Sequence, residues 1–349
     1  MTTEFGGGDE IRFERRGQAG IVTLTRPKAL NAVTHNMVKA LSKALTSWEA
    51  DPTVAAVIIK GEGRAFSAGG DIVHVYHEGL KGNPPVDFFA DEYRLNAQIA
   101  RFRKPYVALI DGIVMGGGVG LSFHGSHRVM TENAQFAMPE VGIGFFPDVG
   151  GSHILPDLGE NFGFYAALTG NRVRYGDALW SGLATHTVKS EYLAGIEERI
   201  AETGDADLAL REAFAPAHRE TEDAAVHAIA HHFSHETLDG VLASLKAAST
   251  TDAFAARTLG TMLTRSPTSL RVTFRQIREG QGKPMDDCMR MEFRIVNRML
   301  AGHDFYEGIR AALIDKGDTP RWSPARVEDV DDAAVAHYFG PLGDKELTL

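Results

Sequence analysis

The residues best suited to chemistry are two acids, Glu140 and Asp148, within the glycine-rich, apolar stretch AMPEVGIGFFPDVGGS at 137–152. Burying a carboxylate among apolar side chains raises its pKa and prepares it for proton transfer or nucleophilic attack. Glu140 fits this description, because apolar residues follow it in the sequence. Asp148 stands just before the sequence VGG, where it fits equally well as the cap of a helix. The pair predicts acid–base or covalent catalysis, with a capping role for Asp148 as the alternative.

Glycine-rich segments supply a second kind of chemical group, the exposed backbone amide. Three of them each follow an expected strand, at 61–72, 111–120 and 140–151. Two backbone N–H groups that point at one carbonyl oxygen stabilise the negative charge that develops there, as an oxyanion hole. We expect Gly70 and Gly117 to be these donors. The alternative is that Asp71 caps a helix and that the glycines around Gly117 only allow close packing.

The same segments do not match the common nucleotide-binding or serine-hydrolase motifs. Leu121 stands where a G-x-G-x-x-G fingerprint starting at residue 116 needs its third glycine, and no Walker lysine follows any segment. Ser152 lacks the second glycine of a nucleophile elbow. Three histidines share one expected helical face: His227, His231 and His235. Without an H-E-x-x-H pattern they indicate a solvated face and no metal site.

Strands and helices must position these groups, and the apolar periodicity predicts both. Expected strands lie at 11–17, 20–27, 54–63 and 105–112, and expected helices at 34–50, 86–102 and from 116. Their alternation predicts an α/β fold with a covered sheet. Beyond about residue 161 nearly everything is expected to be helical, except a strand at 184–190. We therefore expect an α/β core at 1–190 that carries the site, and a helical region at 191–349 that forms a lid or an oligomerisation surface and ends in an extended tail.

The composition is that of a globular protein of 349 residues, 44% hydrophobic and 23% charged. The formal net charge of -10 argues against a broad nucleic-acid-binding surface. Cys288 is the single cysteine, which excludes an intrachain disulfide and suits a reducing compartment. Residues 1–19 lack a signal-peptide pattern, and no apolar run reaches membrane-spanning length. We expect a cytoplasmic protein without a membrane or nucleic-acid partner.

Several long motifs resemble the crotonase (enoyl-CoA hydratase/isomerase) superfamily. They are SAGGDI at 67–72, ALIDGIVMGGGVGLS at 108–122 and AMPEVGIGFFPDVGG at 137–151. Two C-terminal stretches resemble the hydrolase branch of that family, SPTSL at 266–270 and GHDFYEGIRAALIDKGDTPRWSP at 302–324. The resemblance implies a crotonase-like ββα spiral core and an acyl-CoA substrate.

Carried over position by position, the resemblance implies a set of site residues. Gly70 and Gly117 would donate the oxyanion-hole hydrogen bonds, and Glu140 would be the principal catalytic carboxylate. Asp148 stands where similar hydratases carry glycine and the hydrolases carry aspartate. Glu92 matches an acid that contacts the substrate in the hydrolase branch, although by default it would be a solvated surface acid.

The resemblance also implies a reaction. Gly120 replaces one of the two glutamates with which the hydratases activate water, so water addition loses its usual pair while thioester hydrolysis gains Asp148. We expect hydrolysis of a short branched 3-hydroxyacyl-CoA, with 3-hydroxyisobutyryl-CoA as the leading substrate, in valine breakdown. No cofactor is expected beyond the coenzyme A moiety. The alternatives are an enoyl-CoA hydratase or isomerase and a noncatalytic acyl-CoA-binding protein.

Two further expectations concern the coenzyme and the assembly. Arg26 and Lys28, in the sequence RPKALNA, are expected near the phosphates of coenzyme A, because family members bring this loop near the nucleotide. The alternative is that both are solvated surface charges. Related folds form trimers or paired trimers, so we expect the chain to self-associate, with a trimer or hexamer as possibilities.

Overall fold

The computed structural model describes residues 4–349, which form two compact units that alternate along the chain. The first unit contains the chain up to Asp71 together with Ala90–Phe136 and Val173–Glu220. The second contains Ile72–Phe89, Ala137–Arg172 and Thr221–Leu349. Each unit is a group of segments that pack together. The expected division of roles at residue 190 stays a prediction.

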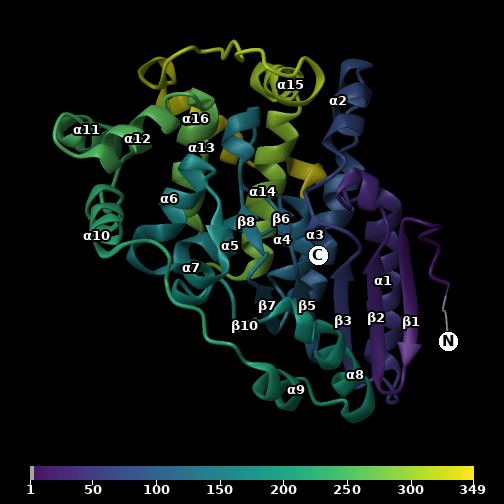
Figure 1. Ribbon diagram of the computed structural model, residues 1–349. Coiled ribbons are helices and arrows are strands. Elements are labelled where there is room, and N and C mark those ends of the chain that lie inside the picture. The colour runs from purple at the N-terminus through teal and green to yellow at the C-terminus, as the bar shows by residue number, and fades with distance from the viewer. Residues whose placement is uncertain (1–3) are drawn as a thin grey trace. The chain divides into compact units, whose positions relative to one another are not determined.

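The larger sheet of the first unit has six strands in the order β1-β2-β3-β5-β7-β10 (Figure 1). Their bounds are Ile11–Arg16, Ala19–Leu24, Ala56–Gly61, Tyr106–Ile110, His127–Thr131 and His186–Val188. The first two strands pair antiparallel, and all other pairs are parallel. Burial on both faces of a parallel sheet explains the continuous apolar runs that predicted these strands. The expected α/β class is therefore confirmed.

Helices of the first unit cover both faces of this sheet. They are α1 His35–Ala50, α4 Gly117–Ser122, α7 Tyr175–Trp180, α8 Leu193–Thr203 and α9 Ala206–Ala213, with 3-10 turns at Pro27–Ala29 and Ser190–Tyr192. Ile21, Ile58 and Leu109 share a core with apolar residues of α8 and α9. The residue before Ile21 in β2, Gly20, faces the opposite side of the sheet, where a Cβ would lie 2.7 Å from the indole of Trp48 on α1.

A smaller sheet of four strands positions the glycine loops. Its order is β4-β6-β8-β9, with bounds Ala65–Ser67, Ile113–Met115, Gln135–Ala137 and Val173–Arg174. Strand β4 follows β3 and β6 follows β5 along the chain, and β4 and β6 pair parallel, with Ala65 opposite Ile113. The loops that leave β4 and β6 therefore emerge side by side. These loops carry Gly70 and Gly117.

The second unit is mainly helical. Its helices are α2 Ile72–Leu80, α5 Gly151–Ile154, α6 Phe162–Thr169, α10 Asp223–His232, α11 Leu238–Ala248, α12 Ala253–Met262, α13 Pro267–Gly280, α14 Met285–Met299, α15 His303–Ile309 and α16 Asp332–Phe339. Shorter turns lie at Glu140–Ile143, Leu155–Asp157, Gly159–Asn161, Arg310–Ile314, Val327–Asp329 and Gly343–Lys345, and α3, Val86–Ala100, runs from the second unit into the first. Helix α13 contacts α5, α6 and the turn at Glu140, and α14 contacts α5. Both long helices therefore reach the segment that carries Asp148.

Candidate active site

The loops after β4 and β6 bring two backbone amides close together. A Cβ added to Gly117 would lie 3.1 Å from the amide nitrogen of Gly70. Gly117 is the first residue of α4, where backbone N–H groups have no partner inside the helix. The bridge that holds the other loop to Val33 uses the carbonyl of Gly69 and the N–H of Asp71, so the N–H of Gly70 stays outside the pairing. The two expected oxyanion-hole donors are adjacent, and their catalytic role stays a prediction.

Glu92 of α3 lies beside this pair of amides. Its Oε1 would be 2.7 Å from a Cβ on Gly117, and the residue is only 2% exposed, so a solvated surface acid is the wrong description. One turn further along α3, Asn96 is fully buried, and neither end of its amide has a hydrogen-bond partner within residues 4–349. Buried polar groups without partners are rare in proteins. This face of α3 therefore has unused hydrogen-bonding capacity for a polar group of a substrate.

Glu140 begins a 3-10 turn in the second unit and is 5% exposed. Its Oε2 has no hydrogen-bond partner within the described part of the chain. Burial raises the pKa of Glu140 well above its ordinary value, and the charge of Asp148 raises it further. An ionised carboxylate in such surroundings is a stronger base and nucleophile than one in water.

Asp148 lies in a turn whose backbone is strained. It is 5% exposed, and the N-cap of α5 is Gly150, so the capping alternative for Asp148 is wrong. Val149 follows it with a φ of 49°, in the left-handed region. That region costs a non-glycine residue on the order of 1–3 kcal/mol, and a β-branched residue is rarely found there. Other contacts must hold this turn in place.

Two residues outside the sequence motifs hold the turn. Glu292 of α14 accepts hydrogen bonds from the N–H of Gly150 at 2.8 Å and from the N–H of Ser152 at 2.9 Å, and also from the hydroxyl of Ser152. Gln276 of α13 donates from Nε2 to the carbonyl of Pro147 at 2.6 Å. Burial raises the pKa of Glu292 to about 8, because it outweighs these hydrogen bonds, which favour the ionised form.

Arg26 and Lys28, the two residues expected near the coenzyme A phosphates, have different surroundings. The guanidinium of Arg26 donates to the carbonyl of Ala32 and to Asp71 Oδ2, the latter at 3.1 Å. These bonds give Arg26 a structural role, because they tie the loop at 26–32 to Asp71, the residue after Gly70. Lys28 is exposed in the same loop. A role of either residue in binding phosphates stays a prediction.

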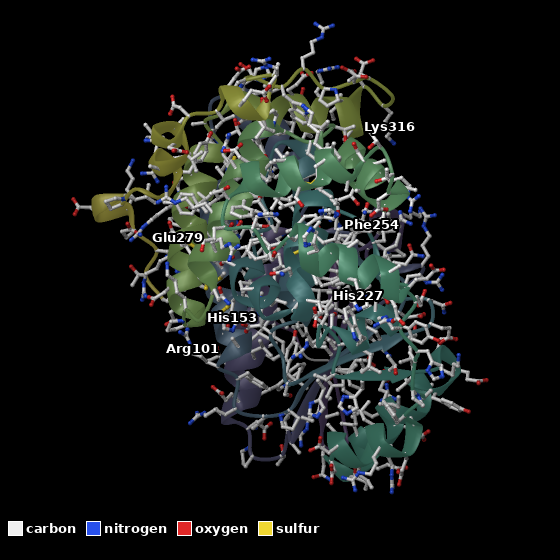
Figure 2. All side chains as sticks on the ribbon, turned by 90° about the vertical axis from the view of Figure 1, so that its left-hand side faces the viewer. Arg101, His153, His227, Phe254, Glu279 and Lys316 are labelled. Atoms are coloured by element: carbon white, nitrogen blue, oxygen red, sulfur yellow. The ribbon has the colours of Figure 1, made fainter. Side chains whose placement is uncertain are left out.

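The three histidines do not share one helical face. Helix α10 ends at His232, so His235 lies beyond the helix, and the expectation that it shares a face with His227 and His231 is wrong. His227 is exposed on α10 (Figure 2). Among residues 4–349, no three His, Cys, Asp or Glu side chains gather in a way that could bind a metal ion. Within the same residues, no helix has the length and apolar character needed to span a bilayer.

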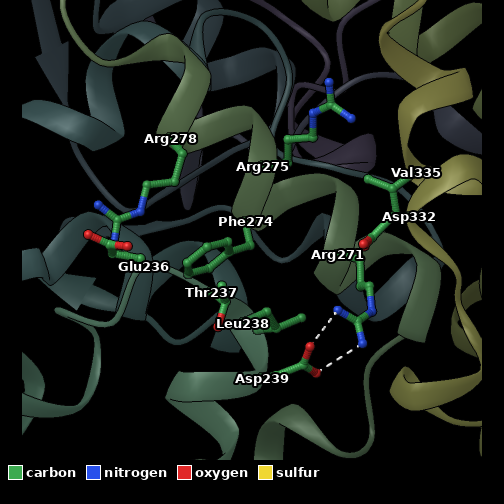
Figure 3. Close-up of a pocket in the computed structure, with 10 residues that line it drawn as sticks. All are labelled: Glu236, Thr237, Leu238, Asp239, Arg271, Phe274, Arg275, Arg278, Asp332 and Val335. Carbon is green, nitrogen blue, oxygen red and sulfur yellow. Dashed lines mark hydrogen bonds and ion pairs between the residues drawn. The ribbon is translucent and has the colours of Figure 1, made fainter.

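A separate pocket of about 350 Å³ lies at α11, α13 and α16 in the second unit (Figure 3). Arg271 binds both carboxylate oxygens of Asp239, at 2.9 and 3.0 Å. Arg278 packs over the ring of Phe274 and donates to the carbonyl of His235. Both arginines are already engaged by neighbouring groups. The side chains that line this pocket include none of the expected site residues.

Comparison with known proteins gives consistent matches over most of the chain. Residues 19–339 match the family model described as enoyl-CoA hydratase/isomerase. The protein of Mus musculus named 3-hydroxyisobutyryl-CoA hydrolase, mitochondrial, is 43% identical, over 97% of this chain and 90% of the relative. The protein of Homo sapiens with the same name is 40% identical, over 99% of this chain and 92% of the relative.

Solved structures match equally well but carry other names. A carnitinyl-CoA dehydratase from Mycobacterium thermoresistibile has a TM-score of 0.91 at 39% identity, and the match covers 98% of this chain and 99% of the other. An enoyl-CoA hydratase from Rhodobacter sphaeroides 2.4.1 has a TM-score of 0.89 at 37% identity, with 97% and 100% covered. The names of these relatives all refer to a coenzyme A thioester, but they refer to different reactions.

Proposed function

Because the chain belongs to the enoyl-CoA hydratase/isomerase (crotonase) family, we propose that it hydrolyses 3-hydroxyisobutyryl-CoA or a similar short, branched 3-hydroxyacyl-CoA. Membership also confirms the expected crotonase-like fold. The observation that carries the proposal is the buried acid pair, in which the charge of Asp148 acts on Glu140. The relatives named as hydrolases, at 40–43% identity over nearly the whole chain, support it.

In the proposed reaction, the carbonyl carbon of the thioester becomes tetrahedral and its oxygen gains negative charge. The N–H groups of Gly70 and Gly117 donate hydrogen bonds to that oxygen. One such donor typically lowers the barrier by about 3–4 kcal/mol. Glu92 binds the 3-hydroxyl of the acyl group, and the products are 3-hydroxyisobutyrate and coenzyme A.

Glu140 has two possible roles in this reaction. It attacks the carbonyl carbon, so that the thiolate of coenzyme A leaves and a mixed anhydride forms, or it removes a proton from an attacking water. Asp148 orients or deprotonates the water that cleaves the anhydride in the first route, and orients the attacking water in the second. Single-turnover hydrolysis in water labelled with heavy oxygen tests the first route, because label in the Glu140 carboxylate requires an anhydride whose glutamyl carbon is attacked by water.

A thiol-release screen over acyl-CoAs with and without a 3-hydroxyl group tests the reaction itself. We expect free thiol from 3-hydroxyisobutyryl-CoA and slower release from isobutyryl-CoA. The rival function is hydration, which the names of the solved relatives favour. In that case crotonyl-CoA would lose its enoyl absorbance without release of thiol.

A change of Asp148 to asparagine tests the coupling within the acid pair. Glu140 reacts in its ionised form, so kcat/KM falls as the pH decreases through the pKa of Glu140. Asp148→Asn removes one cause of the raised pKa, while burial, the larger cause, remains. The acid limb of kcat/KM should move to lower pH than in the wild type and still lie above the ordinary glutamate range. An unchanged limb would show that the two acids do not interact.

The proposal includes no cofactor beyond the coenzyme A moiety of the substrate. It also includes self-association, which sedimentation of the purified protein would test. A cytoplasmic location stays a prediction, since the relatives named as hydrolases are named as mitochondrial.

The proposed position of Lys28 near the coenzyme A phosphates is tested by Lys28→Ala. This change should raise KM for the acyl-CoA and leave kcat unchanged.

A further inference from the structure

We propose that Glu292 and Gln276 act together as a clamp that positions Asp148 for the reaction. The inference rests on the proposed hydrolysis, because it assigns a role to a turn that carries one of the two acids. Neither residue belongs to a motif by which the family was recognised. Both are fully buried, on α14 and α13.

The clamp holds the turn on both sides of Asp148. On the N-terminal side, Gln276 Nε2 donates to the carbonyl of Pro147 at 2.6 Å. On the C-terminal side, Glu292 Oε2 accepts from the N–H of Gly150 at 2.8 Å, and Oε1 accepts from the N–H of Ser152 at 2.9 Å. These three partners in the turn are main-chain atoms, so the clamp fixes the path of the backbone through Asp148, and the hydroxyl of Ser152 is a further donor to Glu292.

The two clamp residues also meet each other. Gln276 Nε2 lies 3.5 Å from Glu292 Oε1, so the amide is oriented with its donor toward both the turn and the carboxylate. Its other end, Oε1, has no hydrogen-bond partner within residues 4–349. The side-chain amide of Gln276 therefore acts in the clamp as a hydrogen-bond donor. A longer or shorter polar side chain at either position would lose the pairing.

The turn needs such support because of its conformation. Val149, directly after Asp148, has a φ of 49°, and a β-branched residue is disfavoured there. The left-handed residue turns the chain so that the N–H groups of Gly150 and Ser152 both face Glu292. Without these acceptors the turn would relax toward an ordinary conformation, and the carboxylate of Asp148 would move. A displacement of about 1 Å in a reacting group can cost on the order of 100-fold in rate.

Glu292 also carries a cost that packing alone does not require. A buried carboxylate is expensive to keep, and an apolar residue of similar size would fill the same space on the apolar face of α14. Glu292 accepts three hydrogen bonds from residues 150–152 and a longer one, at 3.5 Å, from Gln276 of α13, and within residues 4–349 it accepts none from its own helix. This pattern fits a residue retained for the position of the turn.

The test compares single and double variants in a thiol-release assay. Glu292→Gln keeps the shape of the side chain but replaces one acceptor by a donor, which opposes the N–H groups of the turn. We expect kcat to fall about 10- to 100-fold with KM nearly unchanged. In the Asp148→Asn background the same change should have little further effect, because Glu292 acts through Asp148. Equal, additive losses in both backgrounds would overturn the proposal.

A matched control separates the clamp from general destabilisation. Glu197 is also a buried glutamate, paired with Arg16 and Lys60 in the first unit and outside the proposed machinery. Glu197→Gln makes the same chemical change and should keep the wild-type kcat. If Glu292→Gln fails to fold, Gln276→Met replaces it, since it removes the donor to Pro147 and to Glu292 but leaves the carboxylate of Glu292 in place. A wild-type kcat in Gln276→Met would then refute the clamp.

Hydrogen exchange tests the clamp without reference to activity. In the wild-type protein the amides of Gly150 and Ser152 should be protected, and in Glu292→Gln they should exchange at least about tenfold faster. Unchanged exchange would refute the clamp. Absence of thioester hydrolysis in the wild type would refute only the proposed function, and the exchange result would still decide whether the clamp holds the turn.

Discussion

Glu140→Gln should strongly reduce hydrolysis of the thioester while it leaves the protein folded. The amide keeps the size of the carboxylate but can neither attack the carbonyl nor accept a proton from water. General-base or covalent catalysis by a positioned side chain contributes about 10²- to 10⁴-fold, so kcat should fall by about 10³-fold. Binding of the acyl-CoA should persist, and isothermal titration with the intact substrate would then measure it directly.

The same variant should be more stable than the wild type at neutral and alkaline pH. The pKa of Glu140 in the folded protein lies well above its value in the unfolded chain, because of burial and the charge of Asp148. Its favourable contribution is therefore complete below the unfolded pKa and is lost as pH rises through the folded pKa. Above that pH the ionised carboxylate costs stability, and the neutral amide of the variant removes this cost.

Thermal unfolding across pH checks this combination of effects. The difference in Tm between Glu140→Gln and wild type should be positive at alkaline pH and vanish in acid, where both side chains are neutral. Glu197→Gln is the control, because Glu197 has two cationic partners and its change should lower Tm. A loss of stability in Glu140→Gln at alkaline pH would contradict this prediction. It would mean that the ionised carboxylate stabilises the folded protein through favourable contacts.

Much of the fold is predictable because its elements are strongly periodic. The helix at 34–50 was expected from the spacing of Val38, Leu41 and Leu45, and α1 spans His35–Ala50 with Thr34 as its cap. The buried strands were expected from continuous apolar runs. Apolar periodicity is a local property of the sequence, and it indicates which face of a helix or strand is buried. The buried faces in the structure are therefore the ones that the sequence could predict.

The site was only partly predictable, because its distances depend on strand pairing. Gly70 and Gly117 were singled out by their glycine neighbours, but their closeness follows from the pairing of β4 with β6, which no local pattern specifies. The burial of Glu92 is likewise not specified by a local sequence pattern. It depends on which face of α3 is covered, and the sequence DEYRLN alone is compatible with either face.

Glu292 and Gln276 were missed although a weak signal exists. In α14, Cys288, Met289 and Val296 lie on the buried face at helical spacing, and Glu292 falls between them on that face. A charged residue inside an apolar stripe is a reason to look for a buried partner. The partner itself, the turn after Asp148, is more than 120 residues away in the chain, so only the structure could identify it.

Gly117→Ala tests the proposed oxyanion hole with the smallest change the chain allows. The added methyl group would lie 2.7 Å from Glu92 Oε1 and 3.1 Å from the nitrogen of Gly70, so it would enter the space proposed for the substrate oxygen. Removal of one oxyanion-hole donor typically lowers kcat by about 10²- to 10³-fold. We expect a loss of this size, together with a higher KM because Glu92 must move aside.

Gly260→Ala provides the matched control for this variant. Gly260 lies within α12, and a Cβ there meets no atom within 4 Å, so alanine adds a methyl group without a clash and removes a flexible residue from a helix. It should keep the wild-type kcat. It should also raise the free energy of unfolding by less than about 1 kcal/mol, which gives a slightly higher Tm. If Gly117→Ala matched it in rate, the amides of Gly70 and Gly117 would not contact the reacting oxygen. Loss of rate on substrates both with and without a 3-hydroxyl would instead place the methyl group at the carbonyl, because loss of Glu92 alone affects only the hydroxylated substrate.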